Sequence, residues 1–360
     1  MNRTARRMAL ATGLVALTLT ACGERDSSST TADPTTTEPS ESESSAPPVE
    51  ETPDFKACMV SDSGGFDDKS FNQTSFKGLT DAEEQFGIET GEVESNSDAE
   101  YADNIAALVE EGCNQITTVG FLLGDATLAA AKKDKDVDFA IVDFAYEKAP
   151  PNLKGLVFNT GEPSFLAGYA AAATSETGTV GTFGGLNIPS VTDFMTGFLR
   201  GVEYFNEQGD GLDVTVLGWD GTEGSFTEDF EDKAKGQQVA EQMIQQGADV
   251  IFPVAGPAGL GGLQAAQDGD VQAIWVDTDG CVSTDYCDVL LTSVTKGLDV
   301  SVTAAIESSL NDEFSNELYV GTLENGGVGL GQYGESVNAD LEATIEELKQ
   351  MIIDGDIKVS

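Results

Sequence analysis

Four segments of this sequence end a short apolar run with residues of the kind that bind small molecules. They are residues 61–64 (Ser-Asp-Ser-Gly), 142–143 (Val-Asp), 253–256 (Pro-Val-Ala-Gly) and 276–279 (Val-Asp-Thr-Asp). Asp62, Asp143 and Asp277 each place a carboxylate where a predicted strand ends. A lone aspartate at such a place is usually a helix cap or a turn former. Three at equivalent places favour a cleft lined with hydrogen-bond acceptors.

The composition excludes two common kinds of catalytic site. The chain has no histidine, which excludes Ser-His-Asp catalysis, Cys-His catalysis and histidine-ligated metal sites. Its 63 acidic residues leave carboxylate-only hydrolysis open. The acidic clusters at 67–68 and 277–279 lack the ordered ligand spacing of a calcium loop. We therefore expect a non-enzymatic protein without a metal or a cofactor.

The chain is strongly acidic, with 18 basic residues and a net charge of −45. This charge argues against nucleic acid as a partner, because no basic surface is available to neutralise phosphates. The same field disfavours polyanionic small molecules.

Short apolar, β-branched runs alternate with amphipathic helical stretches. Strands are predicted at 55–61, 88–93, 115–119, 138–143, 155–160, 179–184, 213–218, 249–254, 271–276, 289–293 and 318–323. Helices are predicted at 73–86, 98–111, 124–134, 163–174, 190–206, 231–246, 257–267, 297–310 and 339–354. This alternation indicates parallel sheets covered by helices on both faces. Because roughly ten strands in two groups of five are too many for one neat open sheet, we expect two lobes with a break near 160–165.

The first 53 residues have a different character. Arg3, Arg6 and Arg7 precede an apolar run from Met8 to Leu19 that is too short to span a bilayer. The segment 19–22 (Leu-Thr-Ala-Cys) then resembles a bacterial lipobox. We therefore predict a signal peptide at 1–21 and acylation, including palmitate, at Cys22; an ordinary signal peptide with an incidental cysteine is the alternative. Removing 1–21 would take the net charge to about −48.

Residues 23–53 contain no aromatic residue and no leucine, isoleucine or phenylalanine. Such a stretch cannot bury enough surface to offset its ordering entropy, so we predict a disordered tether over 22–53. Four cysteines remain beyond it: Cys58, Cys113, Cys281 and Cys287. They allow three disulfide pairings or free buried thiols. We predict Cys281–Cys287 within one loop, and Cys58–Cys113 because strands one and three of a doubly wound lobe are neighbours.

One longer motif is specific enough to carry a resemblance. Residues 61–73 (SDSGGFDDKSFNQ) resemble the opening motif of the basic membrane protein family, the purine-nucleoside receptor lipoproteins of bacterial ABC importers. Similar segments follow in family order at 97–101 (SDAEY), 161–169 (GEPSFLAGY), 230–236 (FEDKAKG), 247–256 (GADVIFPVAG) and 291–296 (LTSVTK). The resemblance covers nearly all of residues 55–330.

The resemblance implies a type I periplasmic-binding-protein-like fold, α/β, with two doubly wound parallel-sheet lobes and more than one crossing between them. We expect 54–162 with about 295–330 in the first lobe. The second lobe would hold 163–294, with 331–360 as a further candidate piece. The resemblance also implies a nucleoside in the cleft, with its base between Phe71 and Phe230. Asp62, Asn72 and Asp143 would lie near the ligand from the first lobe, while Gly236, Asp277 and Lys296 would hold the ribose side and Gly256 would be a further ligand contact.

The sequence departs from the family pattern in two places. Phe226 lies four residues before Phe230 in an acidic stretch, so the choice of stacking ring stays open. Pro257 stands where the family often has glycine, which leaves the base contacts near Gly256 open. The residue types still fit a nucleoside, because an aromatic ring stacks on a base and an ionised carboxylate accepts from both ribose hydroxyls.

The leading interpretation is a monomeric receptor, lipid-anchored on the extracytoplasmic face of the cell membrane, that delivers a nucleoside to an ABC permease. A sugar or autoinducer receptor on the same fold is one alternative. It would keep Asp277 but would not need two facing phenylalanines. A carboxylate-dependent nucleosidase is the alternative from another class.

Overall fold

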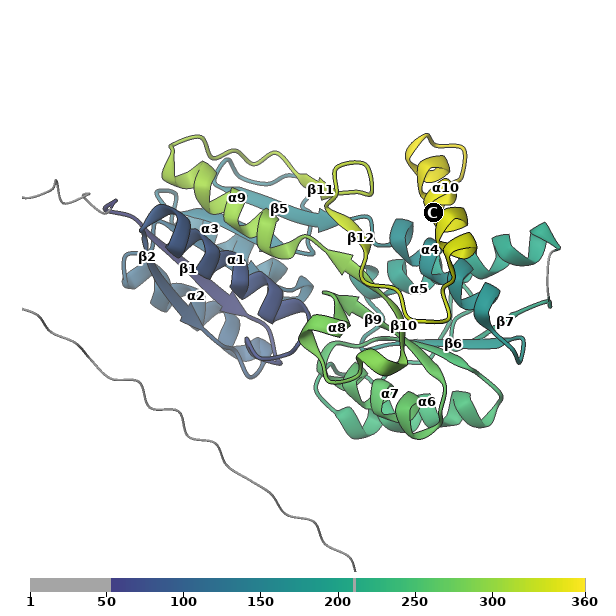
Figure 1. Ribbon diagram of the computed structural model, residues 1–360. Coiled ribbons are helices and arrows are strands. Elements are labelled where there is room, and N and C mark those ends of the chain that lie inside the picture. Colours follow the sequence, from purple (N-terminus) through teal and green to yellow (C-terminus); the bar gives the residue numbers. More distant parts are fainter. Residues whose placement is uncertain (1–52, 210–211, 360) are drawn as a thin grey trace, which may run out of the picture. The chain divides into compact units, whose positions relative to one another are not determined.

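The computed structural model describes residues 53–209 and 212–359. Within them, two six-stranded sheets are each covered by helices on both faces (Figure 1). The predicted signal peptide, the acylated Cys22 and the tether up to residue 52 lie outside the described residues. Among the described helices, none combines the length and the apolar character needed to span a bilayer.

The first sheet is built mainly from the N-terminal part of the chain. Its strands are β1 (Lys56–Ser61), β2 (Glu89–Val93), β3 (Gln115–Val119), β4 (Asp138–Val142), β5 (Leu153–Phe158) and β11 (Tyr319–Gly321), in the spatial order β11-β5-β4-β3-β1-β2. Its helices are α1 (Phe71–Phe86), α2 (Tyr101–Glu110), α3 (Gly124–Lys133) and α9 (Leu298–Leu310). α1 packs beside α9, and α2 beside α3. We call this sheet with its helices the first lobe.

The second sheet repeats this plan. Its strands are β6 (Thr179–Gly184), β7 (Thr215–Leu217), β8 (Val250–Val254), β9 (Gln272–Asp277), β10 (Leu290–Lys296) and β12 (Val328–Leu330), in the order β12-β10-β9-β8-β6-β7. Its helices are α4 (Gly161–Thr174), α5 (Pro189–Gln208), α6 (Lys233–Gln245), α7 (Gly256–Asp268), the short α8 (Gly280–Ser283) and α10 (Ala339–Ile353). We call this group the second lobe. The prediction of two doubly wound parallel-sheet lobes is confirmed.

The sheets differ from the predicted count by β12, which the sequence pattern did not indicate. β12 is only three residues long, includes a glycine, and runs antiparallel along the edge of β10. All other strand pairs in the described residues are parallel. The segment around β12 is rich in glycine (Gly326, Gly327, Gly329 and Gly331) and contains no apolar, β-branched run for the pattern to recognise.

The chain crosses between the two sheets three times. The crossings follow β5, β10 and β11, and they lie side by side. The N–H of Asn159 in the first crossing donates to the carbonyl of Gly321 (2.8 Å), and Gly297 donates to Gly327 (2.9 Å). Because the third crossing ends at β12, residues 328–330 pair with the second sheet.

Buried apolar side chains hold each layer in place. The largest group fills the α1 and α9 face of the first sheet and continues into the α4 and α5 face of the second, with Leu79, Ile306, Phe165 and Phe198 among its members. Separate groups fill the α2 and α3 face and the α6 and α7 face. The two lobes therefore share a continuous apolar core through the crossings.

Candidate ligand-binding cleft

A cleft of about 610 Å³ lies between the two sheets, at the carboxyl ends of their strands. Its lining comes from both lobes and comprises Asp62, Ser63, Asp68, Phe71, Asn72, Gly120, Phe121, Leu122, Asp143, Ile188, Ser190, Val191, Phe194, Phe230, Val254, Ala255, Gly256, Pro257, Val276, Asp277 and Lys296. The structure thus brings every predicted ligand residue to one place except Gly236.

Two phenylalanines reach the cleft from opposite lobes. Phe71 is the first residue of α1, and Phe230 lies in the loop before α6. Phe226 does not line the cleft; its ring packs edge-on against Trp219 with centroids 6.2 Å apart. Gly185 makes the position of the Phe230 ring possible, because a Cβ there would collide with that ring. Of the two candidates for a stacking ring, Phe230 is the one at the cleft.

Lys296 sits at the centre of the cleft, where the last residue of β10 meets both lobes. Its ammonium lies 2.6 Å from Asp143 in the first lobe and 3.2 Å from Asp277 in the second. It also lies 4.9 Å from the ring centre of Phe71 and 5.0 Å from that of Phe194. Burial by itself lowers the pKa of Lys296, but the two carboxylates outweigh burial and raise it. The lysine therefore stays charged and can give a further N–H to a ligand.

Asp62 and Asn72 form a polar pair on the first-lobe wall. The amide of Asn72 donates to one carboxylate oxygen of Asp62 at 2.8 Å. The other Asp62 oxygen lies against Gly120, where any Cβ would collide with it. The side-chain carbonyl of Asn72 is buried without a hydrogen-bond partner among the described residues. This pair therefore offers unused oxygen atoms to a ligand.

Burial changes the charge that this pair presents. Desolvation raises the pKa of Asp62 to about 8, although the bond from Asn72 opposes the shift. At neutral pH the Asp62 carboxyl is therefore largely protonated and can both donate and accept. A flat ring with mixed donors and acceptors along its edge suits such a group.

Asp68 organises the start of α1 but was not singled out as a site residue from sequence. Its carboxylate accepts from the backbone N–H groups of Ser70 (2.9 Å), Asn72 (2.8 Å) and Gln73 (3.0 Å). This bonding satisfies N–H groups that a helix start leaves unpaired. It fixes Phe71 and Asn72 where they enter the cleft. Burial nevertheless raises the pKa of Asp68 to about 6.

The start of α5 supplies an apolar wall that sequence reasoning missed. Ile188, Ser190, Val191 and Phe194 all line the cleft from this turn. Their helical spacing resembles an ordinary core-facing pattern. The only usable signal was Pro189, which marks a helix start in the loop after β6 ends at Gly184.

The two glycines assigned to the second lobe have different places. Gly256 lines the cleft at the start of α7 with a left-handed φ of 51°, and its nearest neighbour is Phe230. Gly236 is buried in α6, where a Cβ would collide with the carbonyl oxygen of Ala258 in α7. Gly236 therefore allows two helices to pack closely, and the structure does not bring it to the cleft.

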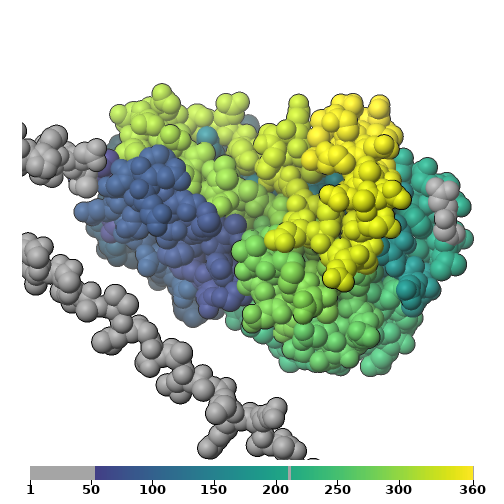
Figure 2. Space-filling model, viewed as in Figure 1, coloured from purple at the N-terminus to yellow at the C-terminus, as the bar shows by residue number. Residues whose placement is uncertain are grey.

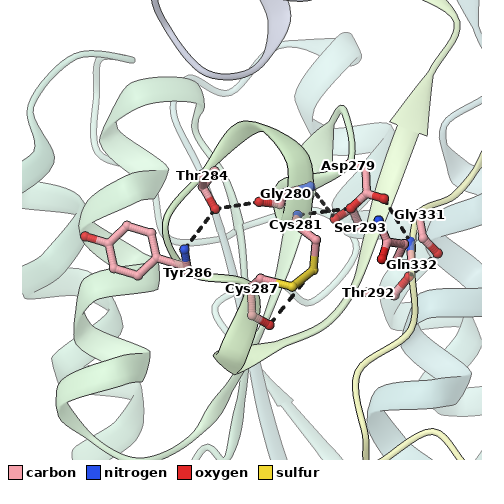
Figure 3. Close-up of a disulfide and its surroundings, with 10 residues drawn as sticks. All are labelled: Asp279, Gly280, Cys281, Thr284, Tyr286, Cys287, Thr292, Ser293, Gly331 and Gln332. Atoms are coloured by element: carbon pink, nitrogen blue, oxygen red, sulfur yellow. Dashed lines mark hydrogen bonds between the residues drawn. A yellow bond between two sulfur atoms is a disulfide. The ribbon is translucent and has the colours of Figure 1, made fainter. Parts of the chain in front are cut away.

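Both predicted disulfides are present. Cys58 in β1 is bonded to Cys113, just ahead of β3, with Cα atoms 6.0 Å apart. Cys281 and Cys287 close a small ring in the segment that follows β9. Figure 3 shows this ring beside Asp279, whose carboxylate accepts from the N–H groups of Cys281 (3.0 Å) and Gln332 (3.2 Å). The ring thus restrains the segment directly after Asp277.

The acidic groups of the cleft do not form a metal site among the residues that the structure describes. Within residues 53–209 and 212–359, no group of three or more His, Cys, Asp or Glu side chains could hold a metal ion. The charged groups at the cleft centre are paired with one another instead. The arrangement can hold a polar molecule between two aromatic rings by hydrogen bonds from both lobes.

Comparison with known proteins decides the family. A sequence profile described as "ABC transporter substrate-binding protein PnrA-like" matches residues 55–360. The chain belongs to this family. The resemblance noted in residues 61–73 is therefore confirmed over the whole described region.

Several curated relatives share most of the length of this PnrA-like chain. The "CD4+ T-cell-stimulating antigen" of Listeria monocytogenes is 33% identical over 328 residues, which cover 85% of this chain and 88% of the relative. "Basic membrane protein A" of Borreliella burgdorferi is 30% identical over 84% of this chain and 87% of the relative. The "ABC transporter nucleoside-binding protein BmpA" of Lactococcus lactis is 28% identical over 85% of this chain and 89% of the relative.

Solved structures agree with the fold of this PnrA-like protein. An ABC transporter solute-binding protein from Aeropyrum pernix superposes with a TM-score of 0.74 at 26% identity, covering 84% of this chain and 92% of that one. The arabinose-binding protein AraP from Geobacillus stearothermophilus gives 0.59 at 14% identity, covering 82% and 99%. The second likeness concerns the fold alone.

Proposed function

We propose that this PnrA-like protein captures a nucleoside, with a purine base, by closing its two lobes around it. The observation that carries the proposal is the pair Phe71 and Phe230, which line one cleft from opposite lobes. Two rings facing one cleft suit a flat base, whose stacking on an aromatic ring is worth about 1–3 kcal/mol in nucleic-acid binders. The Lactococcus lactis relative with a nucleoside-binding name supports the same ligand class.

The remaining groups fit the other parts of a nucleoside. Asp277 accepts hydrogen bonds from the ribose hydroxyls, while Lys296 and Asp143 complete the polar centre. Asp62 and Asn72 face the edge of the base. Because neither lobe alone makes this pocket, the ligand binds the closed arrangement best and shifts the protein towards it.

The proposal includes delivery to an ABC permease at the outer side of the cell membrane. The supporting features are the membership of the ABC transporter substrate-binding family and the lipobox-like segment that ends at Cys22. In this proposal the acylated cysteine anchors the protein, and the tether lets a monomeric receptor reach the permease. Mass analysis of the mature protein tests the anchor, and an unacylated N-terminus would reject it.

The ligand class is tested by calorimetry with inosine, adenosine, AMP and L-arabinose. We expect both nucleosides to bind and AMP to bind far more weakly, because the protein carries strong negative charge and offers no arginine in the cleft lining. Binding of arabinose without inosine would favour the sugar receptor. AMP binding at least as tight as adenosine would contradict the proposal, and release of free base from inosine would indicate a nucleosidase.

A further inference from the structure

Two buried side chains at the edge of the cleft donate hydrogen bonds from one lobe to the other. The hydroxyl of Ser70 in the first lobe donates to Asp277 in the second at 2.8 Å, and it also lies 3.3 Å from the carbonyl oxygen of Val276. The indole N–H of Trp275 donates to the carbonyl of Lys69 at 3.3 Å. Ser70 and Trp275 are fully buried, and neither lines the cleft. Figure 2 shows the blue-purple surface of the first lobe meeting the green surface of the second on this face.

Both partners of these bonds are held firmly by their own lobes. The carboxylate of Asp68 accepts a hydrogen bond from the N–H of Ser70. The carbonyl of Ser70 accepts hydrogen bonds from both the N–H and the hydroxyl of Thr74. Trp275 and Asp277 lie two residues apart on β9, so they point to the same face of the strand. Lys69 and Asp277 both adopt left-handed backbone conformations, with φ of 64° and 68°. Both sides of the contact are therefore positioned by bonds within their own lobes.

We propose that Ser70 and Trp275 form a latch that stabilises the closed lobes whatever ligand they enclose. The inference rests on the proposed function, because it concerns how the same cleft closes. In the open protein both donors are free to bond water, so the latch bonds favour closure specifically. A larger closed fraction lowers the apparent Kd for each ligand by a common factor, since only the closed state binds fully.

The test compares latch variants with matched controls in the full-length protein. Ser70→Ala removes the hydroxyl, and its control is Ser75→Ala, a buried serine on α1 that bonds only to the carbonyl of Phe71. Trp275→Phe removes the indole N–H, and its control is Trp219→Phe, whose indole bonds Thr196 within the second lobe. Calorimetry with inosine and 2′,3′-dideoxyinosine gives Kd, small-angle scattering gives the ligand-free radius of gyration, and circular dichroism checks folding.

We expect Ser70→Ala to raise Kd about 10-fold and Trp275→Phe roughly 3-fold, because the first bond goes to a carboxylate. Each factor should be the same for both ligands, and both ligand-free latch variants should have a larger radius of gyration than their controls. Controls should bind like wild type. The latch is rejected if both variants bind like their controls, or if only inosine binding weakens, which would mean that Ser70 merely orients Asp277 towards the ribose.

Failure of the proposed function would look different. Wild-type protein would then bind neither nucleoside, and scattering alone would decide the latch. A larger ligand-free radius of gyration in both latch variants than in their controls would support it. Identical radii across all four variants would overturn it.

Discussion

The two lobes place the same residue at the same point and use it differently. Asp143 follows β4 and Asp277 ends β9, and these strands occupy the same third position in their sheets. Both aspartates adopt left-handed conformations, with φ of 63° and 68°, and both pair with Lys296. Asp277 has a further partner, the hydroxyl of Ser70 across the cleft. Among the described contacts, Lys296 is the one second-lobe residue that bonds to the Asp143 side chain.

The neighbouring strand ends show why the cleft needs both lobes. β5 ends in Phe158, whereas β10, at the equivalent position, ends in Lys296. One lobe therefore supplies an aromatic ring where the other supplies the only cation among the cleft-lining residues. A single lysine balances carboxylates from both lobes, so separating the lobes would leave Asp143 without its cation. The two similar scaffolds thus carry complementary charges at this point, Asp143 in one lobe and Lys296 in the other.

The strongest way to break this complementarity is Lys296→Met. It leaves Asp143 and Asp277 facing each other without a cation, and an uncompensated buried charge costs about 3–5 kcal/mol. We expect the free energy of unfolding at pH 7, from urea titration, to fall by about that amount. The loss should shrink as the pH falls, because burial raises the pKa of Asp143 and protonation removes its charge. Lys349→Met, which removes an exposed pair with Glu346, is the control; an equal effect of both variants would refute this view.

A second comparison distinguishes the roles of Asp277 and Asp143 by measuring how each variant binds two different ligands. Asp277→Ala should weaken inosine binding by about 1.5–3 kcal/mol, because ribose hydroxyls lose a charged acceptor in a closed cleft. The loss should be smaller with 2′,3′-dideoxyinosine, which lacks those hydroxyls. Asp143→Ala should show less dependence on the hydroxyls. Calorimetry with both ligands measures this, and equal losses of the two ligands in Asp277→Ala would contradict the assignment.

The aromatic walls give a third comparison between the lobes. Phe71→Ala and Phe230→Ala should each weaken inosine binding by about 1–3 kcal/mol, since each removes one stacking face. Phe226→Ala should matter less, because its ring packs on Trp219 away from the cleft. Folding of each variant is checked by circular dichroism. Wild-type affinity in both Phe71→Ala and Phe230→Ala would remove the main physical support for a nucleoside ligand.

The last prediction concerns Asp62 and pH. Its pKa rises from the ordinary 3.8 to about 8 in the folded protein, so folding takes up a proton between these values. The contribution of Asp62 to the free energy of unfolding of wild type is therefore fully present below about pH 4, and it is lost as the pH rises towards 8. Asp62→Asn cannot titrate, so its unfolding midpoint should rise relative to wild type as the pH increases.

Asp220→Asn provides a control that should not vary in this range. Hydrogen bonds, first from the N–H of Glu223, lower the pKa of Asp220 below its ordinary 3.8, so the stability that this group gives wild type is complete above that value and is lost only as the pH falls below it. The difference in midpoint between this variant and wild type should therefore stay nearly constant as the pH rises to 8.5. Thermal unfolding from pH 4 to pH 8.5 compares the three proteins, and a midpoint difference for Asp62→Asn that stays constant with pH would contradict the shift.

The sequence predicted the sheets better than it predicted the cleft walls. Aspartates at strand ends could be placed because strands of parallel sheets have recognisable apolar runs and a fixed direction. Phe194 could not be placed, because an aromatic residue at helical spacing reads as core, and it is indeed buried beside Lys296. Gly236 was assigned to the ligand site through the resemblance alone. A glycine required by close helix packing and a glycine required by ligand contact look the same in a sequence. Which face a residue presents depends on tertiary packing, and periodicity does not encode it.

The triple crossing between the sheets has a consequence for how the protein is made. The first sheet receives its last strand, β11, and the helix α9 only after the chain has passed through all of the second sheet except β12. A nascent chain emerging N-terminus first thus cannot finish its first lobe until about residue 321 has appeared. Until then the apolar side of α1 lacks its partner helix. Completion of the first lobe therefore waits until almost the whole chain has been synthesised.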